Sequence, residues 1–262
     1  MPLVLGVIPA RYQSTRFPGK ALAPLGDRSL VEEVWHRAKG AKKMDRLVIA
    51  TDDRRIAEAA SGFGAEVCMT SESHPSGTDR VAEVVGSLEE GYDLILSIQG
   101  DEPLLTPTSL DRLIVAFEDE PRPQMATLVE PIESAEELFD PNVVKVVANS
   151  EGRALYFSRS AIPYHRGQAS ALEPDFSDSL SRRPGGLDGY LKHQGIYAYT
   201  RESLRRVTLL PPSPLEVDEG LEQLRALEAG CFIQVVQSDF RSMSVDTPVD
   251  LERVTRFLLE AN

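Results

Sequence analysis

Short apolar runs alternate with helix-period segments along the first half of the chain, and this alternation most limits the folds that it can adopt. Val4–Ile8, Arg46–Ala50 and Leu94–Ile98 have the length and apolar character of buried strands. A capping-box pattern, Ser29 with Glu32, opens a helical stretch after the first of them. Strands separated by helices imply right-handed crossovers and a sheet that is covered on both faces. We therefore expect an α/β fold with a mostly parallel sheet.

The pattern changes after about residue 125. Three further apolar runs, Met125–Val129, Val143–Val147 and Ala154–Phe157, follow one another with little room for helices. They predict a strand-rich portion or an antiparallel addition to the sheet. We expect one domain over residues 1–262, with this strand-rich portion at about 125–212.

Two later segments are also informative. Leu215–Leu227 has helical spacing and predicts one helix, with Glu216, Glu219 and Gln223 on one face. The stretch Pro163–Tyr190 is rich in Ser, Gly, Pro and Asp, which predicts a long loop. A loop of this length is either a lid or interface element or an ordinary surface loop.

Charge and composition exclude several classes of protein. Lys and Arg total 28 and Asp and Glu total 41, so the formal net charge is −13. Phosphate-backbone binding needs a basic surface, so nucleic acid is not an expected partner. The apolar runs are strand-length, far shorter than a membrane span, so no membrane association is expected. Two cysteines are too few for a disulfide framework, and we expect a cytoplasmic protein.

A basic loop follows the first predicted strand. Arg11, Arg16 and Lys20 lie within ten residues of one another in an otherwise acidic chain. Guanidinium groups and an ammonium at the carboxyl end of a strand suit a polyphosphate ligand, although a solvated basic loop would look similar. The loop is not a P-loop, because Ser14 replaces a glycine and Ala21 replaces the metal-binding Ser or Thr.

Two aspartates are candidate metal ligands. Asp101 follows the buried strand Leu94–Ile98 on a turn, where a carboxylate could hold Mg²⁺ or simply form a Gly-Asp turn. Asp246 precedes Thr247 and Pro248, and either Asp246 or Thr247 could cap the C-terminal helix. Only a partnership with Asp101 would make Asp246 a metal ligand.

Three polar residues of the later half are weaker candidates. Arg159 lies at the end of a predicted strand. His193 and Tyr197 are four residues apart in another predicted strand and therefore share a face. Each of them also fits an ordinary structural role.

Taken together, these residues resemble the CMP-Kdo synthetase family, the 3-deoxy-manno-octulosonate cytidylyltransferases. The matching blocks run in family order along nearly the whole chain. They are Ile8–Lys20, Ser76–Arg80, Gln99–Pro103, Tyr156–Arg159, His193–Tyr197, Pro212–Glu216, Leu221–Arg225 and Val245–Pro248.

The resemblance implies a single α/β domain of the nucleotide-sugar-transferase type, with a mixed sheet and a homodimeric assembly. It implies Mg²⁺-dependent transfer of CMP from CTP to the 2-hydroxyl of 3-deoxy-manno-octulosonate (Kdo). The products would be pyrophosphate and CMP-Kdo, the activated sugar for lipopolysaccharide biosynthesis.

The resemblance also implies roles for individual residues. The catalytic set would be Lys20, Arg11, Asp101 and Asp246, and the two aspartates would share Mg²⁺. The nucleotide-binding residues would be Ala10, Arg11, Arg16, Lys20, Ser76, Gly77 and Gln99. The sugar-acid-binding residues would be Gln99, Arg159, His193, Tyr197, Glu216, Glu219 and Gln223.

Two alternative functions remain open, the same transfer to a related sugar acid and CTP binding without catalysis. Val217 and Asp218 depart from the family's usual pattern, and the added carboxylate would suit a related sugar acid such as 8-amino-Kdo or a sialic-acid-like substrate. A non-catalytic CTP-binding sensor is the alternative of a different class. It should have lost the metal carboxylates, whereas both Asp101 and Asp246 are present.

Overall fold

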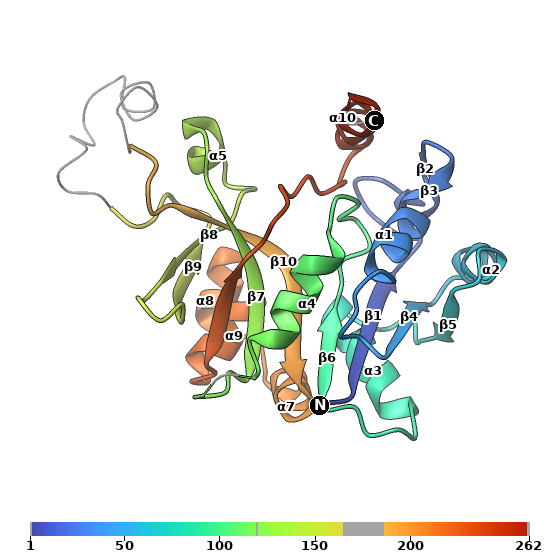
Figure 1. Ribbon diagram of the computed structural model, residues 1–262, viewed down its shortest axis with the longest axis horizontal. Coiled ribbons are helices and arrows are strands. Elements are labelled where there is room, and N and C mark those ends of the chain that lie inside the picture. The colour runs from blue at the N-terminus through green and yellow to red at the C-terminus, as the bar shows by residue number, and fades with distance from the viewer. Residues whose placement is uncertain (1, 119, 165–185, 261–262) are drawn as a thin grey trace.

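A mixed sheet of nine strands runs through the part of the chain that the computed structural model describes, residues 2–118, 120–164 and 186–260. Its strands are β1 (Val4–Ala10), β4 (Arg46–Thr51), β5 (Glu66–Met69), β6 (Leu94–Ser97), β7 (Met125–Pro131), β8 (Lys145–Ala148), β9 (Ala154–Ser158), β10 (Leu191–Thr200) and β11 (Ile233–Gln237). The order is β11-β7-β10-β6-β1-β4-β5, and β8 and β9 extend from β10 (Figure 1).

Strand direction decides where the functional loops lie. β1 pairs in parallel with β4 and β6, and β4 with β5, whereas β10 is antiparallel to both β6 and β7. β11 is parallel to β7. All strands of the main path except β10 therefore end at the same edge of the sheet, which lies at the top of Figure 1. This arrangement confirms the predicted mixed, mostly parallel α/β sheet.

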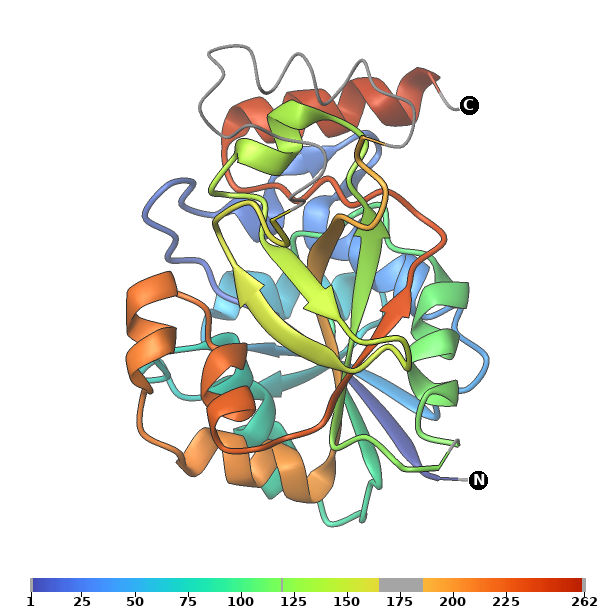
Figure 2. The same cartoon turned by 90° about the vertical axis from the view of Figure 1, so that its left-hand side faces the viewer.

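Helices cover both faces of the sheet. They are α1 (Leu30–Ala38), α2 (Arg54–Gly62), α3 (Gly77–Ser87), α4 (Pro107–Val115), α5 (Ala135–Phe139), α7 (Arg201–Leu209), α8 (Pro214–Glu219), α9 (Gln223–Glu228) and α10 (Pro248–Glu260). One apolar core packs Ile8 and Leu96 against α1, α2 and α4, and a second packs Leu5 and Ile95 against α3 and α7. α9 packs beside β9 (Figure 2). A short 3-10 turn (Lys20–Leu22) and a hairpin of β2 (Pro24–Leu25) and β3 (Arg28–Ser29) precede α1.

Local signals in the sequence account for several helix boundaries. Ser29 and Glu32 form the expected capping box at the start of α1. The predicted single helix over Leu215–Leu227 is wrong, because the chain forms α8 and α9 with a break between them. Gly220 ends α8 in the left-handed conformation at φ 62°, which a residue with a side chain rarely adopts. Glu216, Glu219 and Gln223 therefore do not share one helical face.

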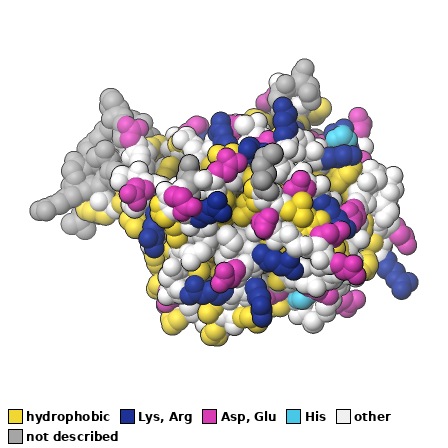
Figure 3. Space-filling model, turned by 60° about the horizontal axis from the view of Figure 1, so that its bottom comes forward, with side chains coloured by type: hydrophobic (Ala, Val, Ile, Leu, Met, Phe, Trp, Pro, Cys, Tyr) yellow, Lys and Arg dark blue, Asp and Glu magenta, His cyan; other side chains and the backbone are white. Residues whose placement is uncertain are grey.

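Other features of the chain bear on its environment. No helix among the described residues is long and apolar enough to cross a membrane. Basic and acidic side chains are interspersed on the face shown in Figure 3. Most of the predicted loop over Pro163–Tyr190 lies outside the described residues.

Candidate active site

The segments that follow β1, β6 and β11 meet at the carboxyl edge of the sheet, where open α/β sheets bind ligands. A cavity of about 910 Å³ opens there. The residues singled out from the sequence that line it are Arg16, Gln99, Asp101, His193, Tyr197, Gln223 and Asp246. The edge of the sheet thus brings together side chains that are far apart in the sequence.

Lys20 lies between the two predicted metal ligands. Its Nζ donates to Asp101 Oδ2 at 2.5 Å and to Asp246 Oδ1 at 3.1 Å, and also to the carbonyl oxygen of Val245 at 3.2 Å. Arg16 contributes a second cation, with its Nη2 3.0 Å from Asp246 Oδ2. Burial alone would lower the pKa of Lys20, but the two carboxylates outweigh it and the pKa is raised. Lys20 is therefore a fixed positive charge between the Asp101 and Asp246 side chains.

The cap of α10 is formed by Thr247. Its Oγ1 accepts from the Asp250 N–H at 3.3 Å, and Asp250 Oδ2 accepts from the Thr247 N–H at 2.9 Å. Pro248 occupies the first helical position. The structure thus selects Thr247 over Asp246 as the capping residue. The Asp246 carboxylate is directed toward Lys20 and Arg16 instead.

The basic loop turns back on itself beside the end of β1. Gly19 adopts φ 73°, and its N–H donates to the Tyr12 carbonyl oxygen at 2.8 Å. A Cβ at Gly19 would lie 3.1 Å from the Tyr12 ring, so the turn requires glycine. The guanidinium of Arg55 covers the Tyr12 ring at 3.3 Å. Arg11 is exposed, next to the buried Ala10 that ends β1.

The N-terminus of α3 lies beside the same strand end. Ser76 caps the helix by accepting from the Asp79 N–H at 3.2 Å. Gly77 faces Pro9, whose Cγ would lie 3.4 Å from a Cβ at that position. Ser76 Oγ also donates to Glu222 Oε1 at 3.3 Å, which ties α3 to the break between α8 and α9. The free N–H groups of a helix start and its dipole favour an electronegative ligand here.

An aromatic wall is formed by His193 and Tyr197, whose ring centroids lie 5.3 Å apart. Burial lowers the pKa of His193 to about 3, so its ring is neutral near pH 7. Thr127 Oγ1 donates its single proton to backbone carbonyl oxygens and lies 3.1 Å from His193 Nε2. We therefore assign the ring proton to Nε2, which leaves Nδ1 as an acceptor.

The neutral state of His193 predicts a pH dependence of stability. An unfolded histidine binds a proton as the pH falls below about 6.5, whereas folded His193 does so only near 3. Protonation therefore favours the unfolded state between these two pKa values, and stability falls on acidification through this range. We expect the unfolding free energy, measured by urea denaturation, to fall less in His193→Gln than in the wild type when the pH is lowered from about 7.5 to about 5. Equal losses would contradict this role of burial.

Three sequence-predicted sugar-binding residues, Arg159, Glu216 and Glu219, are not among the residues that line the cavity, and other protein groups occupy their polar atoms. Arg159 donates its Nε to the Glu219 carbonyl oxygen at 2.7 Å and its Nη1 to the Pro141 carbonyl oxygen at 2.8 Å. The Glu219 carboxylate accepts from Ser158 Oγ at 2.6 Å and from the Arg159 N–H at 2.9 Å. Glu216 pairs with Arg225, with Nε and Oε2 2.7 Å apart. In this structure their polar groups are used to join β9, α8 and α9.

Glu216 is expected to matter for stability. It accepts from the Ser213 N–H in a second capping box and forms an ion pair with Arg225 in a largely buried position. We expect Glu216→Gln to cost about 3 kcal/mol of unfolding free energy, because it leaves the Arg225 charge uncompensated. Asp218→Asn on the exposed side of α8 is the matched control, with an expected change within about 0.5 kcal/mol. Chemical denaturation measures both, and a Glu216→Gln variant as stable as the control would refute the pairing.

Comparisons with known proteins decide the family. The cytidylyltransferase family model matches residues 5–239. A 3-deoxy-manno-octulosonate cytidylyltransferase of Solibacter usitatus is 47% identical over 253 residues, which cover 97% of this chain and 93% of that protein. A protein of the same name from Geobacter sulfurreducens is 46% identical over 96% of this chain and 97% of its own length. The chain belongs to the 3-deoxy-manno-octulosonate cytidylyltransferase family.

A solved structure agrees with this family. The CMP:2-keto-3-deoxy-manno-octonic acid synthetase complexed with CTP is 38% identical to this chain. It superposes with a TM-score of 0.86 and covers 99% of this chain and 100% of its own. The resemblance drawn from the motifs is thereby confirmed.

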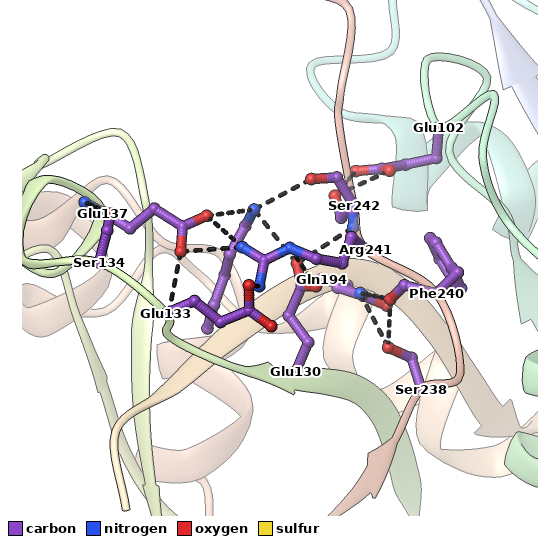
Figure 4. A network of polar contacts seen from close by, with 11 residues as sticks. Glu102, Glu130, Glu133, Ser134, Glu137, Gln194, Ser238, Phe240, Arg241 and Ser242 are labelled. Atoms are coloured by element: carbon purple, nitrogen blue, oxygen red, sulfur yellow. Dashed lines mark hydrogen bonds and ion pairs between the residues drawn. The ribbon is translucent and has the colours of Figure 1, made fainter. Parts of the chain in front are cut away.

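This member of the cytidylyltransferase family also has a polar network that the sequence did not indicate (Figure 4). Glu102 and Glu130 are buried beside Lys192, Arg241 and Ser242. All of these residues except Glu130 line the cavity. Burial raises the pKa of Glu102 to about 8, and the nearby Asp101 carboxylate adds to the effect. The one sequence signal for this network was the position of Glu130, a charged residue within the largely apolar strand β7.

Proposed function

We propose that this chain catalyses Mg²⁺-dependent transfer of CMP from CTP to the 2-hydroxyl of Kdo, giving CMP-Kdo and pyrophosphate for lipopolysaccharide biosynthesis. The observation that carries this proposal is the convergence on Lys20 of Asp101 and Asp246, two carboxylates that line the cavity. The family and the CTP complex of the similar synthetase supply the substrates.

The donor set fits Mg²⁺. Two carboxylates from different segments already converge on one cation, the Lys20 ammonium. Magnesium prefers one or two protein carboxylates, with substrate phosphates and water completing its octahedron. The described residues contain no cluster of three or more His, Cys, Asp or Glu side chains that could hold a metal, so a closed all-protein site is not the design supported here. Asp101 and Asp246 would hold the ion.

We assign the nucleotide to the side of the cavity formed by the basic loop and α3. Arg11, Arg16 and Lys20 would bind the triphosphate, because guanidinium forks and an ammonium match its oxygens. Ala10, Ser76 and Gly77 would contact the cytosine from adjoining strand and helix ends. Gln99 lines the cavity between this side and the aromatic wall, and would contact both substrates.

The sugar acid would bind on the aromatic side. His193 Nδ1 can accept from a sugar hydroxyl, and Tyr197 lies beside it. Gln223 is buried in the cavity wall, and its Nε2 has no hydrogen-bond partner among the described residues, so it is available as a donor. We keep Arg159, Glu216 and Glu219 as proposed sugar-binding residues, which would require the Arg159–Glu219 and Glu216–Arg225 contacts to rearrange.

The reaction is an in-line displacement in which the 2-hydroxyl oxygen attacks the α-phosphorus of CTP. The bond from the α-phosphorus to the bridging oxygen breaks, pyrophosphate leaves with that oxygen, and the hydroxyl proton passes to water. Bound Mg²⁺ would polarise the α-phosphate and acidify the attacking hydroxyl. Lys20, Arg11 and Arg16 stabilise the negative charge that grows on the leaving group. The cavity holds both substrates in position, which converts an encounter of two molecules into a reaction within one complex.

We also propose that the protein acts in the cytoplasm, which its two cysteines favour, and that it is a homodimer, as the resemblance implies. Size-exclusion chromatography with light scattering tests the assembly, and a monomer would contradict it.

A substrate panel tests the proposed specificity. CTP would be offered with Kdo, 8-amino-Kdo and a sialic acid, and the nucleotide-sugar product would be detected by ³¹P NMR. We expect product with Kdo at a rate at least about tenfold above the others, because each binding contact that discriminates them is worth about 1.4 kcal/mol or more. A preference for another sugar acid would reject Kdo but keep the cytidylyl transfer.

A further inference from the structure

The segment that carries Asp246 has little regular structure of its own. Residues 238–247 join β11 to α10 without a helix or a strand. The backbone is tied to the rest of the protein near its two ends, where the Ser238 N–H donates to the Val129 carbonyl oxygen and the Val245 N–H donates to the Asp101 carbonyl oxygen, each at 2.9 Å. The middle of the segment therefore needs side-chain contacts to hold its place.

Ser242 supplies several of these contacts, through all three of its polar groups (Figure 4). Its N–H donates to Glu130 Oε1 at 3.1 Å, and its Oγ donates to the Glu102 carboxylate at 2.8 and 2.9 Å. Its carbonyl oxygen accepts from Lys192 Nζ at 3.0 Å. Ser242 is buried, as are Glu102 and Glu130, so none of these bonds can be replaced by water at low cost.

The partners of Ser242 are fixed in turn. Lys192 Nζ lies 3.2 Å from Glu130 Oε1 and 3.6 Å from Glu137 Oε1. Arg241, next to Ser242, pairs with Glu137 at 2.9 Å. The network therefore connects β7, β10 and α5 to one point of the segment.

Ser242 is linked to the parts of the chain that carry both proposed metal ligands. Glu102 follows Asp101 directly, and Ser242 lies four residues before Asp246, so the Ser242–Glu102 bond joins the Asp101 turn to the segment that carries Asp246. We propose that Ser242 is a positioning residue whose three-way anchoring fixes where Asp246 lies opposite Asp101. This inference rests on the proposed function, because it concerns how the metal carboxylates are held.

Metal binding can be measured without turnover. Mn²⁺ would be titrated into the protein with CTP present, and free Mn²⁺ would be followed by electron paramagnetic resonance. We expect Ser242→Ala to weaken Mn²⁺ binding about tenfold, the usual scale for residues that orient metal ligands. Its kcat should fall and recover in part at high Mg²⁺, while KM for CTP at saturating Mg²⁺ changes by less than about twofold.

Two further variants of Ser242 separate positioning from folding. Ser242→Thr keeps the hydroxyl and should restore most of the metal affinity. Ser242→Cys keeps a side chain of similar size but replaces the hydroxyl with a weaker hydrogen-bond donor. If Ser242→Ala fails to fold, Ser242→Cys takes its place, and we expect it to weaken Mn²⁺ binding in the same way.

Ser203→Ala is the control, because Ser203 is also a buried serine whose hydroxyl donates a hydrogen bond, in this case to backbone carbonyl oxygens, and it lies on α7 at the opposite end of the sheet. It should leave Mn²⁺ affinity unchanged.

Asp101→Asn in the same titration distinguishes a failure of the Ser242 positioning role from a failure of the proposed metal site. Loss of Mn²⁺ binding in Asp101→Asn with wild-type binding in the folded Ser242 variants would overturn the positioning role and leave the proposed function standing. Unchanged binding in Asp101→Asn would overturn the metal site, and the inference would fall with it.

Discussion

Asp101→Asn is expected to lower kcat at least about 100-fold while the protein remains folded. The turn after β6 tolerates asparagine, and the Asp101 carbonyl oxygen that binds Val245 belongs to the backbone. What the variant loses is one negative charge of the proposed Mg²⁺ site. Steady-state pyrophosphate release at limiting and saturating Mg²⁺ measures the loss. A variant with near-normal kcat at limiting Mg²⁺ would remove Asp101 from the metal site.

Asp246→Asn is the companion variant. Because Thr247 caps α10, the change costs no helix cap, and we expect unfolding free energy within about 1 kcal/mol of the wild type. Activity should nevertheless fall about as far as in Asp101→Asn, since both carboxylates serve one ion. A loss of stability without a loss of activity would assign Asp246 a structural role instead.

Lys20→Met should separate turnover from metal binding. The ammonium contacts both carboxylates, so its removal leaves Asp101 without this cation and Asp246 paired with Arg16. We expect kcat to fall at least about 100-fold, because the charge that stabilises the leaving pyrophosphate is lost. Mn²⁺ binding without CTP should strengthen about tenfold, since the cation that contacts both carboxylates no longer competes with the ion.

Lys42→Met, at an exposed lysine outside the cavity lining, is the matched control and should change neither quantity. Weaker Mn²⁺ binding in Lys20→Met would contradict competition between the ammonium and the metal for these carboxylates. Full activity in that variant would remove Lys20 from the catalytic set.

Local patterns predicted the parts of this molecule that depend on a few neighbouring residues. Ser29 with Glu32 predicts the start of α1, and the apolar strands β1, β4 and β6 predict the edge at which ligands bind. Asp101 could be placed at that edge because it follows a buried strand. The alternation of apolar residues on β1, with Leu5 and Ile8 in opposite cores, reflects burial on both faces.

Features that depend on distant contacts could not be predicted in the same way. From the sequence, the Asp246 carboxylate could either cap α10 or bind a ligand. Its contact in the folded protein is with Lys20, 226 positions away, and no local pattern predicts a contact over that separation. Likewise Ser242 meets Glu102 across 140 positions of sequence. The break at Gly220 had a local signal, because a glycine interrupts the helical pattern there. The prediction followed the helical spacing of the flanking leucines instead.

The most direct test of the central claim is pyrophosphate release in the presence of CTP, Mg²⁺ and Kdo, with each component omitted in turn and with EDTA added to the complete mixture. We expect release only when all three components are present, and we expect EDTA to abolish it. Release without Kdo, or undiminished release in EDTA, would contradict a metal-dependent cytidylyl transfer to this sugar acid.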